Sequence, residues 1–329
     1  MIATLKPALL VLISFLSLIS ALNDCSLSLK NHILTCEDVD FAAASDSEGL
    51  NPIEAQLSNE TVVLILKNSK TLDLKPEYHT ELFQVLNSYQ VTSVKSLKIA
   101  PETFINLTTL EYVKICDNDY HKILANTFFG LEKLRTLNLN NNSIHEVEAG
   151  AFNSLTSLET LELTHNDFKI LRSRLFASLV SLKSLFLYHN NIEVLEDGCL
   201  EGLENLGVLD LTYNRIANIN AEMFNGLASL SQLYLSYNRI GRIEGDFTLE
   251  RLEFLYLQNN KLTTVSESMF SSLATLRDVD ISRNRIDELS PLAFYNCSRL
   301  MNLNYKENNL KQRVEFEFAA NGTSPLITA

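Results

Sequence analysis

Apolar side chains recur along this chain in short segments that share one pattern. An apolar residue is followed by polar positions and then by two more apolar residues one position apart, as in Leu134, Leu137 and Leu139. Alternation of apolar and polar positions over about five residues is typical of a strand that buries one face. The pattern therefore predicts many short strands rather than long helices.

The segments repeat with a period of 24 residues, and an asparagine marks the repeats. Every step between these asparagines is 24 residues except the step from Asn238 to Asn260, which is 22. A large apolar residue, usually phenylalanine, follows most of them after ten residues. The predicted structural asparagine ladder consists of Asn118, Asn142, Asn166, Asn190, Asn214, Asn238, Asn260, Asn284 and Asn308. Such repetition predicts a solenoid whose turns stack on one another.

The repeating unit, L-x-x-L-x-L-x-x-N with a later phenylalanine, resembles the extracellular leucine-rich repeat family over about residues 61–310. The resemblance implies an α/β repeat fold: a right-handed leucine-rich repeat solenoid, or horseshoe, with a parallel β-sheet on its concave face. Irregular or short helical segments are expected on the convex face. Buried asparagine side chains would pair the backbone groups of each turn, which are costly to bury alone.

The chain is expected to consist of four parts. Residues 1–21 are predicted to be a secretory signal peptide, because Lys6 precedes an apolar stretch, residues 8–19, that is too short to span a bilayer. Residues 22–60 form an N-terminal cap, residues 61–312 about ten repeats, and residues 313–329 a C-terminal cap strand and tail. With no later apolar stretch long enough for a membrane anchor, we expect a soluble, secreted, extracellular protein.

Both ends of a solenoid need a cap. At the front, Cys25 and Cys36 enclose a short alternating segment that can fold back as a hairpin, and a Cys25–Cys36 disulfide is expected to staple it. At the rear, Val314, Phe316 and Phe318 alternate with glutamates and predict a final strand over the open end. That end is either a simple cap, which we favour, or the contact of a homo- or hetero-dimer or another partner.

The three other cysteines lie too many repeat units apart to pair with one another. Cys199 and Cys297 occupy core positions and are predicted to be buried. Cys116 is at an outward strand position and is therefore the candidate for a bridge to another molecule. Secretion would also make the N-x-S/T sequons sites of glycosylation, at Asn59, Asn106, Asn141, Asn296 and Asn321.

The acidic charge balance excludes several partners. The chain has 40 acidic and 27 basic residues, and removal of the signal peptide with Lys6 leaves a formal charge of -14. Nucleic acid, polyanionic glycans and anionic membrane surfaces are therefore not expected partners.

Outward strand positions are free to vary, and here they gather aromatic residues. We number each unit from its first apolar residue, so that the ladder asparagine is at position 9; positions 3, 5, 7 and 8 then face outward or follow the strand. The predicted ligand-binding residues on the concave face are Phe186, Tyr188, Tyr213, Tyr234, Tyr237, Phe254, Tyr256, Asp278 and Asp280. Strands favour aromatic residues anyway, but clustering on the outward face is typical of protein interfaces.

Two histidine pairs share positions in adjacent units, His165 with His189 and His121 with His145. Either pair could bind a metal or act as a pH switch, but no third ligand is evident, and solvated surface histidine is the favoured interpretation. The catalytic motifs of hydrolases, zinc proteases and phosphate-binding loops are absent from the sequence. We expect no enzyme, no cofactor and no metal.

These observations favour a secreted protein that binds a protein or glycan ligand through the concave face. The signal peptide, the N-terminal cysteine pair and about ten repeats are also similar to the leucine-rich immune proteins of mosquitoes, which would imply a role in innate immune recognition. The chain lacks their C-terminal cysteine pattern and coiled coil. The alternative is a matrix or adhesion component, or a soluble signalling modulator of the Toll-like receptor ectodomain type.

Overall fold

The computed structural model describes residues 25–28, 33–37, 63–76, 86–319 and 325–329. The predicted signal peptide, the sequons Asn59 and Asn321, and most of the predicted N-terminal cap lie outside the described residues. The chain divides into two compact units, residues 1–161 and 162–329. The division falls inside the repeat unit that starts at Leu158, so it does not mark a change in the repeat pattern.

In the first unit, strands at equivalent repeat positions pair in parallel. β3 pairs with β5, β5 with β7, and β7 with β9. A hairpin of β1 and β2 precedes them, and β2 pairs with β3. The strands are β1 (Cys25–Ser28), β2 (Ile33–Glu37), β3 (Val63–Lys67), β5 (Ser88–Thr92), β7 (Tyr112–Cys116) and β9 (Thr136–Asn138). β11 (Thr160–Glu162) spans the division between the units.

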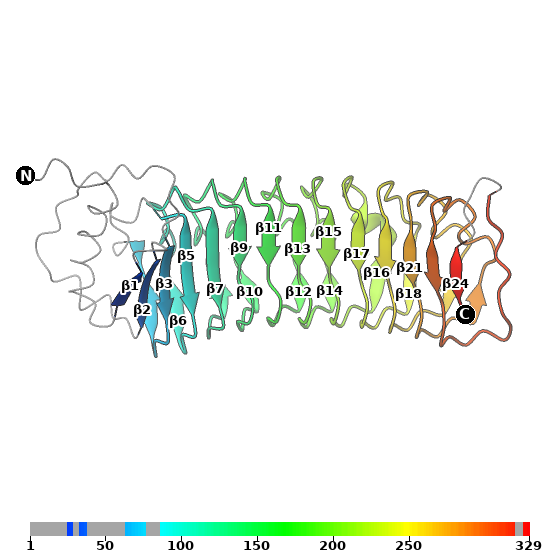
Figure 1. Ribbon diagram of the computed structural model, residues 1–329, viewed down its shortest axis with the longest axis horizontal. Coiled ribbons are helices and arrows are strands. Elements are labelled where there is room, and N and C mark those ends of the chain that lie inside the picture. The colour runs from blue at the N-terminus through cyan, green and yellow to red at the C-terminus, as the bar shows by residue number, and fades with distance from the viewer. Residues whose placement is uncertain (1–24, 29–32, 38–62, 77–85, 320–324) are drawn as a thin grey trace, which may run out of the picture. The chain divides into compact units, whose positions relative to one another are not determined.

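The second unit continues the same construction with short parallel strands in strict register, which Figure 1 shows side by side. The strands are β13 (Ser184–Phe186), β15 (Val208–Asp210), β17 (Gln232–Tyr234), β19 (Phe254–Tyr256), β21 (Asp278–Asp280), β23 (Asn302–Asn304) and β24 (Leu326–Thr328). The register follows the repeat: Leu209 pairs with Leu233, and Leu233 with Leu255. The step from Asn238 to Asn260 is two residues shorter than the others, and because the strand register is kept, the missing residues come from outside the strand.

The opposite side of the turns also contains strands, which the sequence did not predict. In the first unit, β4 (Leu72–Leu74) pairs with β6 (Leu97–Ile99), and β8 (Lys122–Ile123) with β10 (Glu146–Val147). The second unit has three such pairs: β12 (Ile170–Leu171) with β14 (Val194–Leu195), β16 (Asn218–Asn220) with β18 (Arg242–Glu244), and β20 (Thr264–Val265) with β22 (Glu288–Leu289). Among the described residues of the second unit, helix is limited to the short η3 (Ala221–Phe224).

The core is a column of leucines with a column of phenylalanines beside it. Strand positions 4 and 6, such as Leu233 and Leu235, are fully buried. In the second unit Phe224, Phe247, Phe270 and Phe294 stack in order, with ring centroids 5.1–6.1 Å apart. Phe247 belongs to the shortened unit, where the ten-residue spacing fails, so the sequence pattern missed it. The expected parallel-strand solenoid with little helix is confirmed.

The C-terminal strand is not where the sequence placed it. Residues 313–319, including Val314, Phe316 and Phe318, form no strand; the last strand is β24, which pairs in parallel with β23. Phe316 instead packs edge-on against Phe294 and Tyr305, with centroids 5.7 and 5.6 Å away. The alternation in this segment reflects aromatic contacts with the end of the core; the backbone amides of Glu317 and Ala319 donate to Pro291 and Tyr295, but the segment forms no strand.

Among the described residues, no helix has the length and apolar character needed to cross a bilayer.

Candidate ligand-binding face

The repeat register places position 5 of successive units in one row across the sheet of the second unit. Phe186 pairs with Asp210, Asp210 with Tyr234, Tyr234 with Tyr256, and Tyr256 with Asp280. Each of these side chains is half-buried, whereas the aliphatic residues on either side of it in sequence are buried. The row therefore lies on the sheet face away from the core, as the period-two alternation requires.

Position 3 supplies a second row beside the first. Phe254 pairs with Asp278, and Asp278 with Asn302, whose amide donates to the Asp278 carboxylate at 2.8 Å. Phe254 and Asp278 are half-buried. The structure thus brings the predicted aromatic and acidic residues of β19 and β21 onto one surface.

A ladder of four stacked rings follows the strands at position 8. His165, His189, Tyr213 and Tyr237 have successive centroid distances of 4.5, 4.3 and 4.2 Å and interplanar angles of 14° or less. Tyr188 contacts the ladder edge-on, 5.7 Å from both histidine rings. The predicted residues Tyr188, Tyr213 and Tyr237 are therefore neighbours, and the two histidines join them.

The ladder depends on an unusual backbone conformation at position 8. All four residues have φ between 53° and 55°, in the left-handed region. This conformation costs a residue with a Cβ about 1–2 kcal/mol. Because the same φ recurs at the same position, it carries the four side chains in one direction at the strand spacing, which suits ring stacking. A residue-by-residue interpretation of the sequence gives no sign of this.

Stacking occupies the faces of the ladder rings but leaves their edges accessible. Tyr213 and Tyr237 are 42% and 37% exposed. Exposed edges with hydroxyl groups suit hydrogen bonds and apolar contacts with a protein surface. They are less suited to a sugar ring, which stacks on an open aromatic face.

Burial dominates the electrostatics of the row. It raises the pKa of Asp210 above its ordinary value, although the Thr212 amide donates to the carboxylate at 2.9 Å. Burial, with the charge of Asp278 second, raises the pKa of Tyr256 to about 12. Tyr256 is therefore a neutral hydrogen-bonding group at physiological pH.

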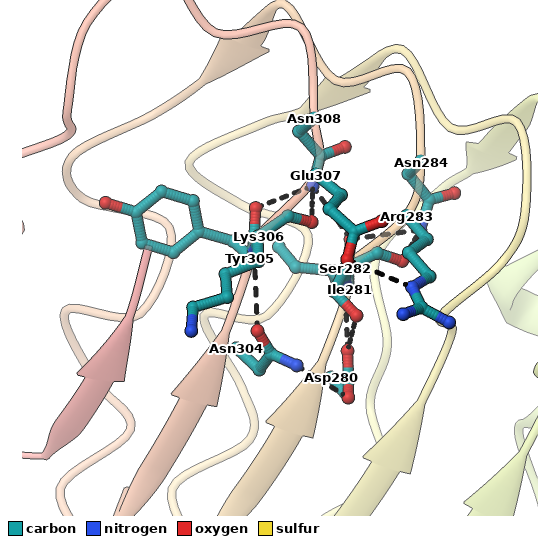
Figure 2. A network of polar contacts seen from close by, with 10 residues as sticks. All are labelled: Asp280, Ile281, Ser282, Arg283, Asn284, Asn304, Tyr305, Lys306, Glu307 and Asn308. Carbon is teal, nitrogen blue, oxygen red and sulfur yellow. Dashed lines mark hydrogen bonds and ion pairs between the residues drawn. The ribbon is translucent and has the colours of Figure 1, made fainter.

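Asp280 is held by neutral donors at the end of β21. Its carboxylate accepts hydrogen bonds from the amide of Ser282 at 2.9 Å and from the side chain of Asn304, also at 2.9 Å (Figure 2). The nearby Arg283 pairs with Glu307, 3.2 Å away, rather than with Asp280. The carboxylate is positioned without being neutralised.

The ladder asparagines serve the turns. From Asn190 to Asn308 the side-chain amide donates to the position-6 carbonyls of its own unit and of the preceding one, as Asn214 does to Leu211 and Leu187 at 3.0 Å each. Its carbonyl oxygen accepts from the Ile192 amide, also at 3.0 Å. Most ladder asparagines are buried, and the last, Asn308, is half-buried.

The structure corrects the interpretation of Cys116. Its side chain is 3% exposed and its thiol donates to the side chain of Asn138, so it does not have the outward exposure that the predicted bridge to another molecule requires. Asn138, the last residue of the neighbouring strand β9, lies against the thiol. Cys199 and Cys297 are buried, and burial raises the pKa of each thiol to about 12, which makes them unreactive.

At the N-terminal end, the backbones of Cys25 and Cys36 are directly paired in the β1–β2 hairpin. The disulfide between them stays a prediction. The three sequons within the described residues, Asn106, Asn141 and Asn296, are exposed, as attachment of a glycan requires.

The histidine pairs lack further ligands. His165 and His189 are 4.5 Å apart by centroid, and His121 and His145 are 5.9 Å apart. Within the described ranges no group of three or more histidine, cysteine, aspartate or glutamate residues is arranged to hold a metal ion. We therefore do not propose a metal centre.

Comparisons with known proteins identify the repeat. One family profile described as "Leucine rich repeat" matches residues 86–144, 132–192 and 181–240. A second, described as "Leucine Rich repeats (2 copies)", matches residues 228–268 and 250–294. A search of curated proteins found no match.

Solved structures share the fold at low sequence identity. A chain of the octameric complex of Latrophilin 3, Unc5D and FLRT2 (LRR) is 22% identical, with a TM-score of 0.68, over 88% of this chain and 85% of that one. A chain of the TLR13–ssRNA13 complex is 21% identical, with a TM-score of 0.52, over 77% of this chain and 48% of that one.

Proposed function

Because the chain belongs to the leucine-rich repeat family, we propose that it is a secreted recognition protein. It binds a protein ligand through the outward sheet face of residues 162–329. The observation that carries the proposal is the gathering of Phe186, Tyr234, Phe254 and Tyr256 on neighbouring strands, at positions that the core does not use. The ring ladder borders that face. We propose no catalytic activity.

A protein ligand is favoured over a glycan. The tyrosine rings of the ladder stack on one another rather than presenting open faces, and half-buried tyrosines with polar neighbours are typical of protein interfaces. A solved relative of low identity lies in a multi-protein complex with Latrophilin 3 and Unc5D, which agrees with this choice.

The proposed biological setting is innate immune recognition in extracellular fluid. It is supported by the predicted signal peptide and by the resemblance to mosquito immune proteins. The alternative is a matrix or adhesion component, or a soluble modulator of the Toll-like receptor ectodomain type, with which the fold of the TLR13 chain agrees. A transcript that rises on infection would favour the immune role, and constant expression would favour the alternative.

The test compares the wild-type chain with a Tyr234→Ala, Tyr256→Ala variant. Both are used to capture binding proteins from the extracellular fluid in which the chain is found, and the ligand is identified by mass spectrometry. The variant should lose at least about tenfold in affinity. A matched control is Tyr295→Ala, which removes an exposed tyrosine outside the strands. Undiminished binding by the double variant would place the site elsewhere.

A further inference from the structure

The row across β15, β17, β19 and β21 reads Asp210, Tyr234, Tyr256, Asp280, with an acidic residue at each end. The two central rings stack, with centroids 5.2 Å apart and an interplanar angle of 20°. Asp278 adds a third carboxylate at position 3 of β21, on the same side of the strand as Asp280. Aromatic surface is thus flanked by negative charge along one line.

Among the described residues, the hydrogen-bond donors to these carboxylates are neutral. Asp210 accepts from Thr212, Asp278 from Asn302, and Asp280 from Ser282 and Asn304. In the part of the chain that the structure describes, none of the three takes part in an ion pair. Neutral donors orient a carboxylate but leave its charge uncompensated.

The nearest basic side chains along the sequence have other partners. Arg277 pairs with Glu253 at 3.3 Å, and Arg283 with Glu307 at 3.2 Å. Neither arginine therefore pairs with the aspartates of β21, which remain available to a cationic group of a ligand. The effect of the uncompensated charge is visible at Tyr256, where the negative charges of Asp278 and Asp280 add to burial in raising the pKa of the phenol.

We propose that this row binds an arginine side chain presented by an extended segment of a partner protein. The inference rests on the proposed function and names the chemistry of its ligand. A guanidinium fits the row: it forms paired hydrogen bonds with a carboxylate, and its planar face packs on the outer face of the stacked tyrosine pair, next to an aspartate. Lysine offers only a point charge and would bind more weakly.

Charge complementarity at longer range favours the same partner. The whole chain has a formal net charge of -13, which attracts basic segments and speeds their association. The row supplies what net charge alone lacks, namely a fixed geometry that distinguishes arginine from other cations. The two contributions can be separated by experiment.

The experiment uses the full chain and three fluorescent peptides of identical sequence except at one central residue: arginine, lysine or citrulline. Citrulline keeps the shape of arginine without its charge. Fluorescence anisotropy should give the tightest binding for arginine, weaker binding for lysine, and at least about tenfold weaker binding for citrulline. Equal binding of arginine and citrulline would overturn the proposal.

A pair of charge-matched variants separates the row from net charge. Asp278→Asn with Asp280→Asn should reduce binding of the arginine peptide by about tenfold or more. Glu267→Gln with Asp287→Asn also removes two negative charges, but at exposed positions away from the row. This variant should change binding of the arginine peptide by less than about twofold. Equal losses in the two variants would show attraction by net charge only and would reject the row.

A charge reversal guards against loss of folding in the asparagine variant. The Asp280→Lys chain should lose the arginine peptide and gain affinity for a matched glutamate peptide, a result that only a folded face can give. Preference of this variant for arginine would contradict the proposal.

The inference and the proposed function fail in different ways. If Tyr234→Ala, Tyr256→Ala loses the natural ligand while the arginine and citrulline peptides bind equally, the binding face stands and the arginine preference is wrong. If the double tyrosine variant keeps the natural ligand, the proposed function itself is wrong.

Discussion

Single residues at two positions of the repeat determine how each turn closes. The ladder asparagine at position 9 pairs backbone groups that would otherwise be buried alone, and the residue before it adopts a left-handed conformation. The first role was predictable because only a short amide side chain both donates and accepts at that spacing. The second was not, because a positive φ is uncommon for residues other than glycine and is not expected for tyrosine.

The asparagine role predicts a large difference between two neighbouring residues. Asn190 donates to the carbonyls of Leu163 and Leu187 and accepts from the amide of Phe168, all buried. Asn190→Ala should lower the free energy of unfolding by about 3 kcal/mol, because those groups lose their partner. Asn191→Ala, which removes only an exposed contact with Asp167, should cost less than about 0.5 kcal/mol. Denaturant titration checks both, and equal losses would contradict the role.

The left-handed backbone predicts an unusual order of stabilities at Tyr213. Both Tyr213→Ala and Tyr213→Gly remove the ring from the ladder, but only glycine relieves the backbone cost at φ 54°. Tyr213→Gly should therefore be more stable than Tyr213→Ala by about 1 kcal/mol. Thermal unfolding of the two variants measures this, and a more stable alanine variant would refute it.

At the scale of elements, parallel strands in register turn one repeated position into a continuous column. This is how leucines, phenylalanines and asparagines each stack, and also how the outward row and the ring ladder arise. The composition of the outward columns was readable from the sequence once the period was known. The contacts within them were not, because side-chain direction at the end of each strand depends on the turn.

The ring ladder predicts a pH dependence of stability. Burial, and then the charge of His165, lower the pKa of His189, and the charge of Asp210 opposes them only partly. The unfolded chain therefore binds a proton more readily than the folded chain, so stability is complete above about pH 7.5 and falls as the pH drops through about 6.5, where the unfolded histidine takes up its proton. His189→Gln should flatten the decrease in Tm between about pH 7.5 and 5.5.

The internal control for this prediction is the range above about pH 7.5, where His189 is neutral in both states. There the wild type and the variant should show parallel pH profiles. A variant whose Tm falls as steeply on acidification as that of the wild type would rule out a contribution from His189.

The C-terminal end shows how an element can be misassigned. Alternating apolar and charged residues at 314–318 predicted a strand, but Phe316 packs on Phe294 and Tyr305, and the last sheet position is taken by β24. Periodicity reports which side chains are buried, not whether the segment joins a sheet as a strand. A pairing partner that is distant in sequence is a tertiary property.

Phe316→Ala should destabilise this end selectively. Loss of a half-buried ring that covers Phe294 is expected to cost about 2 kcal/mol. Hydrogen exchange should quicken in β23 and β24 while β13 and β15 are unchanged, since neighbouring repeats carry most of the coupling. Uniformly faster exchange would show that Phe316 has no local capping role.

Analytical ultracentrifugation of the same variant tests whether the C-terminal end is a dimer contact. A particle mass equal to that of the wild type would exclude Phe316 from such a contact.

At the scale of the whole molecule, the sequence predicts removal of a signal peptide and glycosylation. If the chain is secreted, intact mass should match a chain that begins near Leu22 and carries glycans at exposed sequons such as Asn106, Asn141 and Asn296. Glycosidase treatment should reduce the mass to that of the polypeptide, and substitution of each asparagine by glutamine identifies the occupied sites. A chain retained inside the cell with residues 1–21 intact would contradict secretion.

The sequence by itself determined the repeat, the burial pattern and the outward aromatic positions of this protein, because a fixed period forces equivalent residues into equivalent environments. The tertiary structure decided which of those residues touch. It buried Cys116 against Asn138, stacked His165 and His189 with two tyrosines, and left the aspartates at the ends of the tyrosine row without an ion pair among the described residues. These outcomes depend on backbone angles and side-chain partners in adjacent turns, which pattern and spacing do not specify.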